Sequence, residues 1–192
     1  MAIIAVLASL IFPIAGRIKQ TEQVTQSSSN LKCIGNAILL YANDNEQHLP
    51  VWHDYTIGQY WWEQLLPYVD NNTAIYHSPG HHEFDATSRD KLAETISYGW
   101  NYNVAGRHRG DSSMKGDHAF SLMSFPEPQR TLMVAEGSQS QSWGFIEAAK
   151  PDGNRYGGRI PSVFLDGHVD VLPVTDLQQI DPWFVPITPV PW

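Results

Sequence analysis

The sequence contains little cysteine and few charged residues. It holds one cysteine, Cys33, among 192 residues, so no disulfide can form within the chain. Only 17% of the residues are charged, and 20 acidic residues outnumber 12 basic ones to give a formal net charge of −8. The lysines and arginines are scattered and do not form the basic stripe that nucleic-acid-binding surfaces carry. The composition therefore argues against nucleic acid as a partner.

Catalytic motifs are absent as well. The sequence has no nucleophile elbow, no phosphate-binding glycine loop and no nucleotide-binding fingerprint. Its densest group of candidate metal ligands is His77, His81, His82 and Glu83. However, the Ser78-Pro79-Gly80 turn would break the helix that a zinc-protease motif needs. We therefore expect no catalytic residue, no metal ligand and no cofactor, and a protein that is not an enzyme.

Two acidic turns keep calcium as an alternative. The stretches Asn43 to Glu46 and Asp152 to Asn154 offer the oxygen ligands that calcium prefers, although their spacing is not that of an EF-hand loop. A helix end and a turn are the simpler interpretations of these residues.

The clearest pattern lies in the first fifty residues. An uncharged apolar run from Ala2 to Ile14 continues without a turn signal into a polar stretch that ends near Asn45. In that stretch one set of residues recurs at the spacings of a single helix face: Val24, Leu31, Ile34, Ile38 and Tyr41. Polar residues occupy the opposite face: Gln20, Gln23, Gln26, Lys32 and Asn36. We predict one helix of about 40 residues, with two helices broken at Pro13 or Gly16 as the alternative.

After Pro50 the chain changes to short elements separated by Gly, Pro, Asn and Asp, which is typical of a loop-rich antiparallel sheet. Asp166-Gly167 should form a two-residue type I′ turn between strands at Ser162–Leu165 and His168–Leu172. We also predict a short helix at 59–68. Two further strands are expected at 131–135 and 98–104, and an edge strand at 143–148.

These elements together predict an α+β fold in which the long N-terminal helix packs on a small antiparallel sheet with loop-rich insertions. The expected divisions are residues 1–48 for the helix (apolar 2–14, amphipathic 15–48), 49–180 for the globular part and 181–192 for an extended proline-rich tail. Within the helix we expect Cys33 to be packed and unreactive.

Both ends of the chain carry motifs of one bacterial family. The first end has Ala2 to Pro13, then Ser29 to Gly35 and Tyr41 to Asp44. The other end has Arg155-Tyr156-Gly157-Gly158 and Val163 to Val169, with Trp62 to Val69 and Ser97 to Asn101 fitting between. Together they resemble type IV pilin-like proteins, and more narrowly the pseudopilin-like group with a DUF1559-type domain.

The chain departs from that family in three places. It has no basic leader, cleavage and methylation site or first apolar stretch with its glutamate, so we expect an N-terminally truncated form or a misassigned start. Tyr156 stands where the family has its closing histidine. Ser27 and Ser78 stand where the family often has a pair of cysteines, as expected for a lost disulfide.

The resemblance implies a non-enzymatic, pseudopilin-like structural subunit of a type II secretion or type IV pilus-type assembly. It implies a single-pass helix in the inner membrane, a periplasmic or cell-surface globular domain, and self-assembly or contact with other pilin-like subunits. The expected membrane and filament interface is Ile3, Ile4, Val6, Leu7, Leu10, Ile11, Phe12 and Ile14. The family's turn falls at Asp166, Gly167 and His168.

A carbohydrate- or cargo-binding module on the same kind of anchor is the alternative function. Trp52, Trp61 and Trp62 lie close together in the sequence, and exposed aromatic rings stack on sugars. Trp61 and Trp62 are adjacent on the predicted helix, so we expect one of them to be exposed.

Overall fold

The computed structural model describes residues 2–101, 106, 108–110, 119–137, 143–146 and 153–175, and in the first helix it describes side chains from Gly16 onward. The predicted tail at 181–192 and the predicted strand residues 102–104, 147 and 148 lie outside the described residues, as does Asp152.

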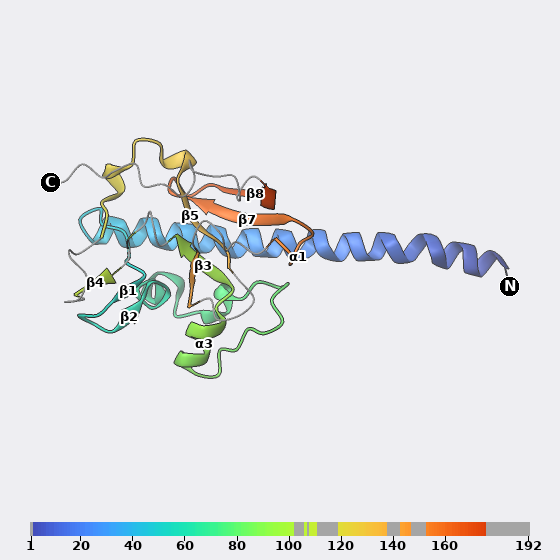
Figure 1. The fold of residues 1–192 in the computed structure, drawn as a ribbon, viewed down its shortest axis with the longest axis horizontal. Helices are drawn as coiled ribbons and strands as arrows, with labels where there is room; N and C mark the ends of the chain where they lie inside the picture. Colours follow the sequence, from blue (N-terminus) through green and yellow to red (C-terminus); the bar gives the residue numbers. More distant parts are fainter. Residues whose placement is uncertain are drawn as a thin grey trace.

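One continuous helix forms the axis of the molecule. The helix α1 (Ala2–Asp44) has 43 residues, as predicted, and neither Pro13 nor Gly16 breaks it. Figure 1 shows its C-terminal half within the folded body and its N-terminal half extending beyond the body. The helix ends where expected, because Asn45 donates a side-chain hydrogen bond to the carbonyl of Tyr41 at 2.8 Å and the next two residues have positive φ.

A five-stranded sheet packs on this helix. Its strands are β3 (Tyr98–Asn101), β5 (Leu132–Glu136), β6 (Phe145–Ile146), β7 (Arg159–Phe164) and β8 (Val169–Pro173), in the order β6-β3-β5-β7-β8. All neighbours are antiparallel except β3 and β6, which are parallel. The sheet is thus mostly antiparallel, and β6 occupies an edge as predicted.

The loops contain smaller elements. A second sheet joins β1 (His53–Asp54), β2 (Gln59–Tyr60) and β4 (His108–Arg109). The predicted helix at 59–68 is instead divided among β2, α2 (Trp61–Gln64) and the 3₁₀ turn η1 (Leu66–Val69), because Pro67 cannot donate the backbone bond that a continuing helix needs. The remaining helical segments are α3 (Arg89–Thr95), η2 (Thr73–Tyr76), η3 (Leu122–Ser124) and η4 (Pro128–Arg130).

The core lies between α1 and the sheet, so the predicted α+β fold is confirmed. The helix contacts β5, β7 and β8, and all five predicted core residues of its apolar face are buried. The approach is close at Gly35, where a Cβ atom would lie 2.7 Å from a methyl group of Val163 in β7. A side chain at position 35 would therefore push the helix away from the sheet.

The β7–β8 hairpin is present, but its turn differs from the predicted type I′. Within the turn only Gly167 has a positive φ, of 81°, and Val163 pairs with Val169. The Gly167 N–H donates to the carbonyl of Phe164 at 2.8 Å, which makes a three-residue loop with its left-handed residue last. The Asp-Gly pair therefore predicted the hairpin correctly and the turn type wrongly.

Candidate functional site

The candidate functional site is the long helix together with the residues that attach it to the sheet. The eight predicted interface residues, Ile3 to Ile14, belong to the part of α1 that extends beyond the body (Figure 1). Their side chains lie outside those that the structure describes. No helix in the described part of the chain combines the length and hydropathy of a membrane span.

A buried ion pair lies where the body meets the middle of α1. Glu136 ends the central strand β5, and Arg155 lies in the segment before β7. The two side chains form an ion pair, and both are fully buried. Arg155 also donates to the carbonyl of Ser97 at 2.8 Å, so a loop next to β3 belongs to the same cluster. Charges buried this deeply persist only where partners surround them.

Ser27 of α1 completes this cluster from the helix side. Its hydroxyl donates to Oε1 of Glu136, and Ser78 donates to the same oxygen at 2.9 Å. Ser27 and Ser78, for which the sequence resemblance implied a lost disulfide, thus meet on one carboxylate. Tyr98 hydrogen-bonds Ser27 at 3.0 Å, and Tyr156 bonds Ser78 and accepts the Gly80 N–H at 3.1 Å.

We refer to Ser27, Ser78, Tyr98, Glu136, Arg155 and Tyr156 as the polar cluster. Burial raises the pKa of Glu136, while Arg155 and the two serine hydroxyls oppose that rise. Burial likewise raises the pKa of both tyrosines, so their phenols stay neutral. The cluster therefore attaches a helix to a sheet through buried hydrogen bonds.

Two further polar contacts hold α1 within the two turns that follow Ser27. Asn30 donates to the carbonyl of His77 at 2.9 Å. Lys32 donates to the carbonyl of Gly167 at 2.7 Å and so fixes the helix to the β7–β8 turn. The helix is thus fastened at several points along its C-terminal half.

The predicted family turn has a local structural role. Asp166 accepts the backbone N–H of His168 at 3.1 Å and contacts the ring Nδ1 of that residue at 2.6 Å. Partial burial raises the pKa of Asp166, but these hydrogen bonds outweigh it and hold the pKa below its ordinary value. The His168 ring stacks on Phe164 with ring centroids 4.4 Å apart.

The side chains of the histidine-rich stretch do not converge on one point, although the ring Nε2 of His77 lies 3.0 Å from the carbonyl oxygen of His81. His81 is buried and its ring bonds the hydroxyl of Ser97 at 2.9 Å, whereas His77 stacks on Phe84. His82 and Glu83 are exposed. Among the described residues, no group of three or more histidines, cysteines or acidic residues is placed to hold a metal ion.

Two expectations for single residues are corrected. Trp61 and Trp62 are both buried, because α2 is only one turn long and core residues surround it on several sides. These two of the three tryptophans named for sugar binding therefore belong to the core. The third, Trp52, is half-buried and donates to the carbonyl of Trp143 at 2.7 Å. Cys33 is exposed on α1 rather than packed, since it follows the buried Leu31 by two positions and points away from the sheet.

The residues that sequence reasoning missed are Glu136, Arg155 and Tyr98. Arg155 and Tyr98 stand inside motifs that resemble the family's, but no pattern in the sequence indicated that they would face one carboxylate. Comparisons of this chain with protein-family models, with curated proteins and with solved structures find no match. The residues and the fold are therefore the basis for a functional proposal.

Proposed function

We propose that this protein is a non-enzymatic, pilin-like structural subunit of a type II secretion or type IV pilus-type assembly. In this proposal the N-terminal half of α1 associates with the inner membrane and with other subunits. The α+β body is carried on the periplasmic or cell-surface side.

The observation that supports the proposal best is that the two halves of one helix have different surroundings. The C-terminal half of α1 supplies core residues to the body, whereas the half that extends beyond the body contains the uncharged run Ala2–Ile14 (Figure 1). An apolar run is unfavourable in water and is stabilised when a membrane or another apolar helix receives it. The continuity of the helix transmits any such contact directly to the body.

The polar cluster supports the proposal in a second way. A subunit that is pulled or packed by one end of a helix needs that helix firmly attached to its globular part. Ser27 lies on α1, and its bond to the buried Glu136 meets this need. A head-to-tail contact between such subunits that does not close generates a filament.

The test is a charge placed in the apolar run. Leu7→Asp should remove the protein from the membrane fraction, because an aspartate in the middle of an apolar helix costs about 2.5–3.5 kcal/mol, or roughly a hundredfold in partitioning. Leu40→Asp is the matched control, since Leu40 lies on the same helix, within the body, and is 53% exposed.

Cell fractionation of both full-length variants measures the effect, and circular dichroism checks that each one folds. Membrane association that survives Leu7→Asp, or is lost equally in Leu40→Asp, would contradict the proposal.

A further inference from the structure

The strand β8 forms one edge of the five-stranded sheet. The N–H of Phe164 donates to the carbonyl of His168 at 2.9 Å, and the N–H of Val174 donates to that of Gly158 at 2.7 Å. Alternate residues bond to the neighbouring strand in an antiparallel pair, so the even-numbered residues of β8 face β7. The residues whose backbone groups point away from the sheet are Val169, Val171 and Pro173. A row of outward backbone groups is where a further strand can add.

Two of these three positions have no N–H to offer a further strand. The N–H of Val171 already donates to the side-chain Oδ1 of Asp170 at 2.7 Å. Pro173 has no backbone N–H at all. Asp170 is exposed, so its carboxylate lies at the surface next to these positions. A strand that approached β8 would therefore meet a negative charge and a row of carbonyl oxygens with at most one donor among them.

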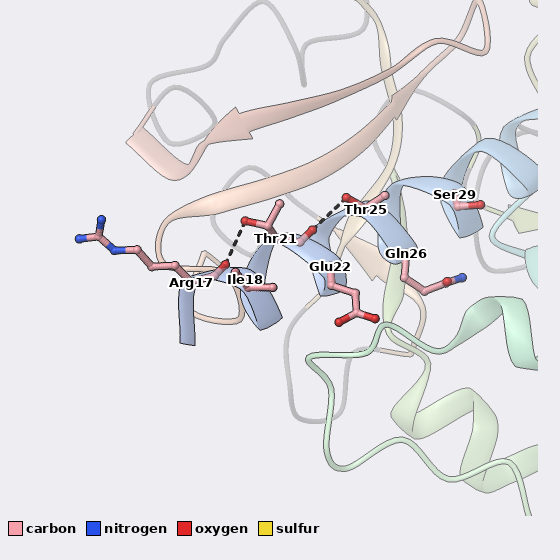
Figure 2. Close-up of a pocket in the computed structure, with 7 residues that line it drawn as sticks. All are labelled: Arg17, Ile18, Thr21, Glu22, Thr25, Gln26 and Ser29. Atoms are coloured by element: carbon pink, nitrogen blue, oxygen red, sulfur yellow. Dashed lines mark hydrogen bonds between the residues drawn. The ribbon is translucent and has the colours of Figure 1, made fainter. Parts of the chain in front are cut away.

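The helix beside this hairpin gives a strand no other place to pair. The helix α1 contacts both β7 and β8, and Figure 2 shows the hairpin alongside the stretch of α1 from Arg17 to Ser29. Backbone groups within a helix bond to one another. In this stretch the hydroxyls of Thr21 and Thr25 also donate to helix carbonyls, at 3.0 and 2.9 Å (Figure 2). A strand that added on this side of the body would have to use the edge of β8.

The opposite edge of the sheet is protected by other means. The edge strand β6 has only two residues. The carbonyl of Gly144, directly before β6, accepts the N–H of Trp100 at 2.9 Å and the indole N–H of Trp61 at 2.6 Å. The carbonyl of Trp143 accepts the indole N–H of Trp52 at 2.7 Å. A short strand whose flanking carbonyls are already bonded is a poor template for strand addition.

We propose that Asp170 and Pro173 prevent the β8 edge from pairing with the same edge of a second copy of this chain. Two β8 strands related by a two-fold axis would run antiparallel and would join two sheets into one. In that pair, carbonyls opposite positions 171 and 173 would find no donor, and the two Asp170 carboxylates would share one interface. The proposal does not rest on the proposed function, because it concerns the sheet alone.

The test restores the donors and removes the charge. Asp170→Thr combined with Pro173→Thr in the full-length chain leaves an outward N–H at every odd position of β8, and threonine favours strands. Sedimentation in detergent solution should show self-association at least about thirtyfold stronger than in the native chain, equivalent to about 2 kcal/mol. Each single variant restores one donor and should strengthen association about fivefold.

The native chain and the variants share the same N-terminal run, so association through that run cancels in the comparison. Glu83→Thr is the matched control, because Glu83 is an exposed acid in a loop outside the sheet and its replacement removes the same charge. Circular dichroism checks that every variant folds.

Hydrogen exchange of residues 169–173 shows whether the contact lies at the edge. In the native chain, protection of this strand should not change with protein concentration, and this measurement needs no variant. In the double variant, protection should rise with concentration. Concentration-dependent protection in the native chain would overturn the proposal. It would also be overturned if folded single or double variants associated no more strongly than the native chain, or if Glu83→Thr associated as strongly as they do.

Discussion

At the scale of single residues, one carboxylate is the centre of the polar contacts between the long helix and the body. Glu136 is fully buried and receives hydrogen bonds from Ser27 on α1, from Ser78 and from Arg155. Removal of one member of such a group leaves a buried charge without its partner, which costs more than the bond itself contributes. Loss of this residue should therefore weaken the helix–sheet contact by more than one hydrogen bond.

Glu136→Gln should lower the free energy of unfolding by about 3–5 kcal/mol, because it leaves the Arg155 charge buried without its carboxylate. Glu127→Gln provides the control, since Glu127 pairs with Arg130 at 3.1 Å on the surface and both side chains are about half exposed. The control should cost no more than about 1 kcal/mol. Urea unfolding measures both, and similar losses for the two variants would disprove the structural role of the cluster.

At the scale of elements, the close approach between α1 and β7 depends on Gly35. Alanine at position 35 would meet the Val163 methyl at 2.7 Å, and the overpacking cost of about 1–3 kcal/mol outweighs the roughly 1 kcal/mol that alanine gains in helix propensity. Gly16 is on the same helix, and a Cβ atom added there would have no atom within 4 Å. Alanine at position 16 therefore gains helix propensity without an overpacking cost.

Gly35→Ala should therefore be less stable than Gly16→Ala by about 1–3 kcal/mol in denaturant unfolding. The comparison uses one substitution on one helix, so helix propensity cancels. If Gly35→Ala proved as stable as Gly16→Ala, the helix and the sheet would not be in the tight contact described above.

The elements also show what the sequence could and could not predict. The spacing of Val24, Leu31 and Ile38 predicted the buried face of α1, because helical periodicity depends on neighbouring residues only. The polar cluster was not predictable in this way, since Glu136, Arg155 and Ser27 come from three distant segments and charged residues are expected at the surface. The turn type was also predicted wrongly from the Asp-Gly pair alone, which gives no information about the bond from Lys32 of α1 to the Gly167 carbonyl.

At the scale of the whole molecule, the two halves of the long helix differ in composition and in surroundings. One half of α1 is committed to the core of the body, and the other half presents an uncharged run outside it (Figure 1). A chain with a net charge of −8 repels copies of itself at long range. Association through an uncharged segment held away from the body avoids most of that repulsion.

The most direct test of assembly through α1 is the position at which copies of the protein meet. In a full-length Cys33→Ser parent, Leu10→Cys and Leu40→Cys each place one thiol on α1, outside and within the body respectively. Treatment of membrane fractions with a bismaleimide cross-linker should give a covalent dimer from Leu10→Cys and almost only monomer from Leu40→Cys. Monomer alone from Leu10→Cys, or dimer in equal yield from both positions, would contradict assembly through the protruding half of the helix.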